Sequence, residues 1–190
     1  MLADAALHTD PLKLDNTLIT CDLFDARYEQ ALARTHPAQH VIRGQILVLL
    51  GRPEQARAEF AAAVAEQRAA LAKNSMDTGA LGDLALALAG LHRFADARRE
   101  GLQALELLPI ARDPDHAPEV IERMALIDLQ SGREEETLDR LEYLLTIPGP
   151  LSQAWLRGHP FWATLRSNPG FQRLTREGGA PGSPRKPGAS

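Results

Sequence analysis

Gly44-Gln-Ile-Leu-Val-Leu-Leu-Gly51-Arg-Pro-Glu-Gln-Ala56-Arg-Ala-Glu-Phe60-Ala-Ala-Ala63 is the stretch that decides the fold, because its pattern returns twice further along the chain. The small residue Gly44 has its counterparts in Ala85 and Ala125, and the two steps along the chain are nearly equal. Each of these small residues precedes a turn and a second helical pattern. A step of roughly 20 to 50 residues is typical of arrays of supersecondary units. The sequence therefore predicts an α-solenoid of helix pairs.

Composition agrees with an all-α fold and narrows the class of protein. Ala and Leu dominate the apolar residues, which favours helix over strand. The formal net charge of −4 leaves no broad basic field for a phosphate backbone, so we expect no nucleic-acid partner. No segment reaches the ~20 apolar residues of a membrane span, and the N-terminal stretch lacks the basic region of a secretory signal. The single Cys21 excludes an intramolecular disulfide, and we expect a reducing, cytoplasmic location.

The pattern of apolar and turn residues divides the chain into four expected parts. These are an N-terminal segment with a partial helix pair, three complete helix pairs, a helical cap and a disordered tail, at residues 1–36, 37–147, 148–175 and 176–190. The three pairs are expected at 38–50 with 53–73, at 77–90 with 94–108, and at 116–131 with 133–146. Asp77 is a candidate N-cap, and Gly132 is a candidate left-handed helix end.

Equivalent positions of the repeat predict how the helices pack. Small residues recur where the two helices of a pair meet, because larger side chains would separate the axes. Phe60 is expected to fill the gap between neighbouring pairs. Gly101 occupies the equivalent position one step later and has no side chain, so we expect a looser second pair.

These positions resemble the tetratricopeptide repeat, in a variant with longer helices than the standard ~34-residue form. The first unit matches the family's small, turn and aromatic positions at Gly44, Gly51, Ala56, Phe60 and Ala63. The second unit matches with its turn glycine displaced to Gly90. The third departs from the small residues at Thr137 and Leu144. The resemblance covers about residues 37–147 and implies a right-handed superhelix that binds other proteins.

A second resemblance lies in the C-terminal part. Gly149-Pro-Leu-Ser152, His159-Pro160-Phe-Trp162 and Asn168-Pro169-Gly-Phe171 are similar to an ending of bacterial multidomain signalling proteins with tetratricopeptide regions. Those proteins carry kinase, cyclase-like or winged-helix modules at the N-terminus. We expect no such module here, because the helical pattern starts near Met1. The chain is then either a stand-alone array or the C-terminal part of a larger protein.

The inner, concave surface of such an array is lined by the first helix of each pair. By register, we expect the partner-binding residues to be Val41, Gln45, Val48, Gly82, Leu86, Ala89, Glu122, Leu126 and Leu129. This strip is mostly apolar and lacks the Lys and Asn with which tetratricopeptide domains clamp a C-terminal carboxylate. It should accept a helix or an apolar peptide face, or pack on a neighbouring domain. In the alternative, parts of it are buried against residues 11–34.

Motifs for catalysis are missing from the sequence. It has no phosphate-binding loop, nucleophile elbow or metalloprotease helix. His36 and His40 have the spacing of two metal ligands, but Pro37 between them and the lack of a third ligand argue against a metal site. We therefore predict a noncatalytic scaffold, without metal or cofactor, that binds a protein or peptide. The alternative function is a C-terminal regulatory or sensory module of a bacterial signalling protein whose effector domain lies outside this chain.

Overall fold

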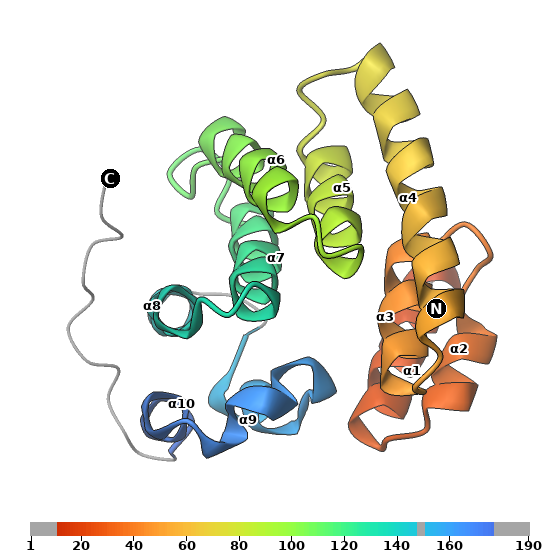
Figure 1. The fold of residues 1–190 in the computed structure, drawn as a ribbon. Coiled ribbons are helices and arrows are strands. Elements are labelled where there is room, and N and C mark those ends of the chain that lie inside the picture. The colour runs from red at the N-terminus through yellow and green to blue at the C-terminus, as the bar shows by residue number, and fades with distance from the viewer. Residues whose placement is uncertain (1–10, 148–150, 177–190) are drawn as a thin grey trace, which may run out of the picture.

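A computed structural model describes residues 11–147 and 151–176, and all regular structure in these ranges is helical (Figure 1). The elements are α1 (Pro11–Phe24), α2 (Tyr28–Arg34), α3 (His40–Leu49), α4 (Pro53–Lys73), α5 (Thr78–Gly90), α6 (Phe94–Leu107), α7 (Ala117–Gln130), α8 (Glu134–Thr146), α9 (Gln153–Gly158), the 3-10 helix η1 (Pro160–Ser167) and α10 (Pro169–Leu174). Helices α3 to α8 agree closely with the expected bounds. The predicted disordered tail lies, from residue 177 on, outside the described residues. Within the described ranges, no helix combines the length and apolarity needed to cross a bilayer.

Four helix hairpins in the described part of the chain close with the same turn. Ala26, Gly51, His92 and Gly132 adopt left-handed backbone, with φ of 55°, 68°, 59° and 78°. The next residue is an arginine each time, and its backbone N–H donates to a carbonyl in the last turn of the preceding helix at 2.7–2.9 Å. This bond marks a Schellman motif. The equivalent of Gly51 and Gly132 is thus His92, so the prediction of a displaced turn glycine at Gly90 is wrong. Histidine enters the left-handed region more readily than most residues.

Each helix packs against its neighbour in the chain from α3 to α8. In addition, α3 contacts α5 and α5 contacts α7, so the first helices of successive pairs lie together. Figure 1 shows these helices in sequence order, with α3, α5 and α7 facing the middle of the molecule. The Asp77 side chain accepts from the backbone N–H of Ala80 at 3.0 Å, which confirms the predicted N-cap of α5.

Phe60 of α4 fills the space between α3 and α5 and is 3% exposed. A Cβ placed on Gly44 of α3 would lie 2.6 Å from its ring, and one placed on Gly90 of α5 would lie 2.5 Å away. Both glycines therefore allow the two helices to approach the ring closely. The prediction that Phe60 fills the gap between neighbouring pairs is confirmed, and Gly90 serves this contact rather than the turn.

Gly101 of α6 does not loosen the second pair. A Cβ at this position would lie 2.7 Å from the Sδ atom of Met124 in α7, and Met124 is completely buried. The thioether of the next pair thus occupies the space that the glycine leaves, as the flexible Met side chain does in irregular cores. The expected looseness at Gly101 is wrong for this reason.

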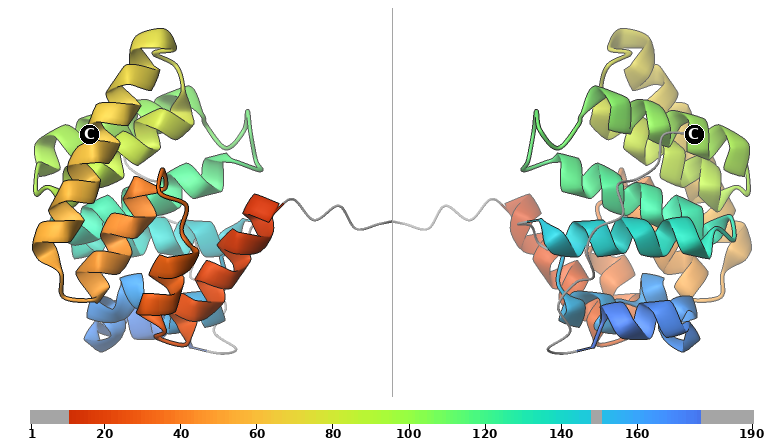
Figure 2. Two further views of the ribbon diagram at one scale, coloured as in Figure 1. Left: turned by 90° about the vertical axis from the view of Figure 1, so that its right-hand side faces the viewer. Right: turned by 90° about the vertical axis from the view of Figure 1, so that its left-hand side faces the viewer.

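Residues 153–174, named here the C-terminal unit, form α9, η1 and α10. Figure 2 shows the unit at one side of the molecule, below both α8 and the N-terminal helices. Its buried side chains, Leu156, Trp162, Leu165 and Phe171, belong to the same core as α3 to α8. Asn168 joins the unit to α8: its Oδ1 accepts from the N–H of Gly170 at 2.8 Å, and its Nδ2 donates to Glu134 at 2.7 Å.

Candidate binding surface

Seven of the nine predicted partner-binding residues line one of two cavities. Most of them line one groove: Gln45, Val48, Ala89, Leu126 and Leu129. Gln45 also lines a second cavity, together with Val41 and Leu86. Glu122 is half-buried, Gly82 is buried, and neither residue lines a cavity. Leu86 and Leu126 are only 6% and 8% exposed, whereas Val48 is 58% exposed. The strip is therefore an exposed apolar surface only in part.

The C-terminal unit crosses this inner surface and meets the end of α1. Phe24 packs edge-on against Trp155 and His159, with ring centroids 5.1 and 5.5 Å apart. His159 stacks on Trp155 at 5.0 Å. Gly158 permits the contact, because a Cβ at this position would overlap the ring of Phe24. His159 lines one cavity and Phe161 the other, so this segment lies between them.

The larger cavity is an apolar groove of about 690 Å³ between α3, α4, α5, α7 and η1. Leu91, Leu129 and Phe161 contribute half-buried apolar side chains to it, and Val48 is its most exposed one. Arg57 is exposed at the groove and forms no ion pair with a described residue. The groove also carries the exposed carboxylate of Glu134, which accepts from Asn168 at 2.7 Å, so an acidic neighbour of an apolar ligand is favoured beside Arg57.

The smaller cavity, of about 490 Å³, is polar. It lies between α1, α3, α4, α5 and α7, with His159 at one side. Arg123 donates to Glu119 at 2.7 Å and pairs with Asp83 at 3.3 Å. Burial raises the pKa of Asp83, and the neighbouring acids Glu119 and Glu66 act in the same direction while Arg123 opposes them. Burial of the Asp83 carboxyl therefore outweighs the attraction of the nearby Arg123.

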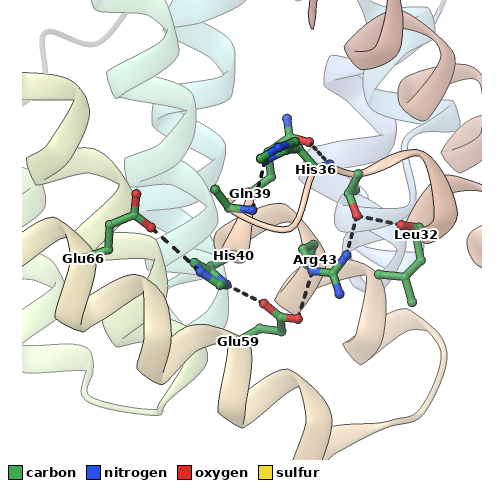
Figure 3. A network of polar contacts seen from close by, with 9 residues as sticks. Leu32, His36, Gln39, His40, Arg43, Glu59 and Glu66 are labelled. Carbon is green, nitrogen blue, oxygen red and sulfur yellow. Dashed lines mark hydrogen bonds and ion pairs between the residues drawn. The ribbon is translucent and has the colours of Figure 1, made fainter.

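His40 connects this cavity to a polar network on α3 and α4. Figure 3 shows its ring between two carboxylates: Nδ1 lies 2.6 Å from Glu59, and Nε2 lies 4.0 Å from Glu66. Arg43 donates to Glu59 at 2.9 Å. Burial opposes ionisation of Glu59, but the hydrogen bonds from His40 and Arg43 outweigh it and lower the pKa of this carboxyl. Glu59 is thus satisfied by two donors, whereas Glu66 has only the more distant ring.

The two histidines with metal-ligand spacing do not converge. The Nδ1 atom of His36 accepts from the backbone N–H of Ala38 at 3.2 Å, while His40 binds Glu59. Among the described residues, no group of three or more His, Cys, Asp or Glu side chains is placed to hold a metal ion. Cys21 is exposed.

Sequence reasoning missed the residues that close the inner surface. Phe24 and Trp155 are far apart in the chain, and no local pattern connects them. The ion pair between Asp83 and Arg123 was also missed, although both residues lie on the first helices of neighbouring pairs. Their shared position on those helices is a signal from which the contact could have been found.

His159 makes the stability depend on pH. Burial lowers the pKa of His159 to about 4 from 6.5. As the pH falls below 6.5, the unfolded chain takes up the proton first, so stability present above pH 6.5 is lost as the pH falls toward 4. When the pH is lowered from about 7.5 to about 5, we expect the titration of His159 to lower the free energy of unfolding by about 2 kcal/mol.

Urea denaturation at a series of pH values checks this expectation. The reference is His159→Asn, which cannot titrate in this range and keeps a side chain able to cap η1. The wild-type protein should lose more stability than the variant as the pH falls. Equal pH slopes for the two proteins would show that His159 is accessible to protons in the folded state.

Comparisons of the chain with protein-family models, with curated proteins and with solved structures found no match. The resemblance to the tetratricopeptide repeat therefore rests on the repeated sequence positions. The geometry adds two facts that bear on it: the turn recurs in successive hairpins of the described residues, and α3, α5 and α7 contact one another in order.

Proposed function

We propose that this protein is a noncatalytic binding module, a tetratricopeptide-like α-solenoid that holds an apolar peptide segment of a partner protein in the 690 Å³ groove. The nearly equal steps from Gly44 to Ala85 and Ala125, the recurring Schellman turn and the contacts among α3, α5 and α7 support the solenoid arrangement. The observation that carries the binding function is the exposed Val48 in an apolar lining whose other members are half-buried or buried.

The chemistry of the groove selects the peptide. Val48, Leu129 and Phe161 offer contacts for two or three apolar side chains. Arg57 at the same groove has no ionic partner among the described residues, so an acidic residue beside the apolar ones would be attracted to it. The proposed occupant is therefore a short apolar segment flanked by Asp or Glu.

Selection from a displayed peptide library tests this proposal. Peptides selected on the wild-type protein should be apolar with an acidic flank. Val48→Glu should weaken their binding at least about tenfold, equivalent to about 1.4 kcal/mol, because it brings a charge into the apolar contact. Met76→Glu is the matched control: Met76 is similarly exposed, at 62%, but lies in the turn before α5, away from the groove.

Two results would count against the groove. One is a selection without enrichment over an immobilised control protein. The other is a set of peptides whose affinity is the same for the wild type and Val48→Glu. Leu86→Glu and Leu126→Glu are unsuitable variants, because both side chains are buried and a charge there would unfold the protein.

The alternative function, a regulatory module of a bacterial signalling protein, stays a prediction. In that case the occupant of the groove would be a segment of a neighbouring domain of the same chain. A coding region for a kinase or winged-helix domain, upstream and in frame, would favour this alternative.

A further inference from the structure

One wall of the apolar groove is the start of η1, and a row of packed rings connects this wall to α1. Phe161 lines the groove, and the centroid of its ring lies 4.7 Å from that of His159. His159 in turn packs edge-on against Phe24 of α1 at 5.5 Å and stacks on Trp155 at 5.0 Å. Phe24 lines neither cavity, so an influence of Phe24 on the groove passes through the ring of His159.

His159 is well placed to transmit a displacement from α1 to the groove. The residue is 6% exposed, so its ring has little room to move independently of its neighbours. Its Nδ1 atom accepts from the backbone N–H of Phe161 at 3.4 Å, which joins the ring to the first turn of η1. Trp162 and Leu165 fix η1 in the core, whereas Phe161 is half-buried on the groove side. The position of the Phe161 ring therefore depends on the ring of His159 beside it.

Gly158 gives an independent indication that the contact with α1 is specific. It is the last residue of α9, and a Cβ placed on it would lie 2.4 Å from the ring of Phe24. Its backbone is not in the left-handed region, so the conformation of the chain does not require glycine here. Alanine is the better helix former. The glycine therefore serves the close approach of the Phe24 ring.

We propose that Phe24 is a positioning residue for the groove: it holds the ring of His159, which in turn sets the ring of Phe161, and peptide binding is thereby coupled to the packing of α1 on the C-terminal unit. The inference rests on the proposed function of the groove. A lining that is already ordered loses less conformational entropy on binding, so the contact at Phe24 favours a bound peptide. The coupling is reciprocal, and a peptide in the groove stabilises the docking of α1.

The affinity of full-length variants for peptides selected on the wild-type protein tests the coupling. Phe24→Ala should weaken binding at least about threefold, and Phe24→Tyr, which keeps the ring, should restore it. Leu102→Ala is the matched control, because Leu102 is equally exposed, at 36%, and lines neither cavity. Gly158→Ala should also weaken binding, but in the Phe24→Ala background it should have no effect, since the added methyl group meets no ring.

NMR of the free protein separates a failure of this coupling from a failure of the groove. The aromatic signals of Phe161 should shift in Phe24→Ala and stay in place in Leu102→Ala, with no peptide present. Unchanged Phe161 signals in a folded Phe24→Ala variant, or equal effects of Gly158→Ala in both backgrounds, would overturn the positioning role. Shifted Phe161 signals without any selected peptide would support that role and count against the proposed function of the groove alone.

Discussion

Replacing Phe60 by alanine is expected to lower the free energy of unfolding by about 4 kcal/mol, near the middle of the range for buried phenylalanines. The ring is 3% exposed and lies against Gly44 of α3 and Gly90 of α5. Neither glycine has a side chain that could move into the space, so the surrounding helices cannot close the cavity without shifting. Urea denaturation followed by circular dichroism measures the effect.

A double-mutant cycle shows whether the two glycines act through the ring. Gly44→Ala alone should destabilise the protein by about 1–3 kcal/mol, because its Cβ would lie 2.6 Å from Phe60. In the Phe60→Ala background the same change should be neutral or stabilising by up to about 1 kcal/mol, since alanine is the better helix former. Additive effects of the two changes would mean that Gly44 is present for another reason.

The close approach at Phe60 could be predicted from the sequence because it depends on equivalent positions of a repeat. The same comparison failed at Gly90, where two local explanations competed. A glycine near the end of a helix suggests a left-handed cap, yet here it makes room for an aromatic ring, and His92 takes the left-handed position. Backbone conformation at a single residue depends on packing that the local pattern does not contain.

The binding surface was predictable only in part. Register placed Val48 and Leu129 on the inner face, and both line the groove. The contact of Phe24 with Trp155 joins parts of the chain that share no repeat position, so periodicity carries no information about it. Leu86 belongs to the buried core that α3 to α8 share, so the strip is less exposed than its register indicates.

A further pattern was available in the sequence and was missed. Asp22 and Asp128 each precede an arginine at the same spacing, Arg34 and Arg140, and each binds it across the hairpin. Asp128 is completely buried and also accepts from Arg98 of the preceding pair at 2.9 Å. Asp128 lies in the last turn of α7, where the helix dipole disfavours a negative charge. The two arginines offset both the unfavourable interaction with the helix dipole and the desolvation of the buried carboxylate.

Asp128→Ala is therefore expected to lower the free energy of unfolding by about 3 kcal/mol, since removing one partner leaves cations without their counter-charge. Arg140 is the more buried partner, with its side chain 17% exposed, so most of the loss should come from this contact. The measurement is again urea denaturation, with Arg98→Met and Arg140→Met as single changes on the other side of the network.

Asp22→Ala is the matched control for Asp128→Ala. The carboxylate of Asp22 also accepts from two arginines, Arg27 at 2.8 Å and Arg34 at 2.7 Å. Their side chains are 47% and 42% exposed, so water can replace the lost partner and the loss of stability should be smaller. Similar losses in the two variants would mean that the contact of the carboxylate with arginine across the hairpin sets the cost, whether or not the arginines are exposed. A larger loss for Asp128→Ala would mean that burial of the arginines sets the cost.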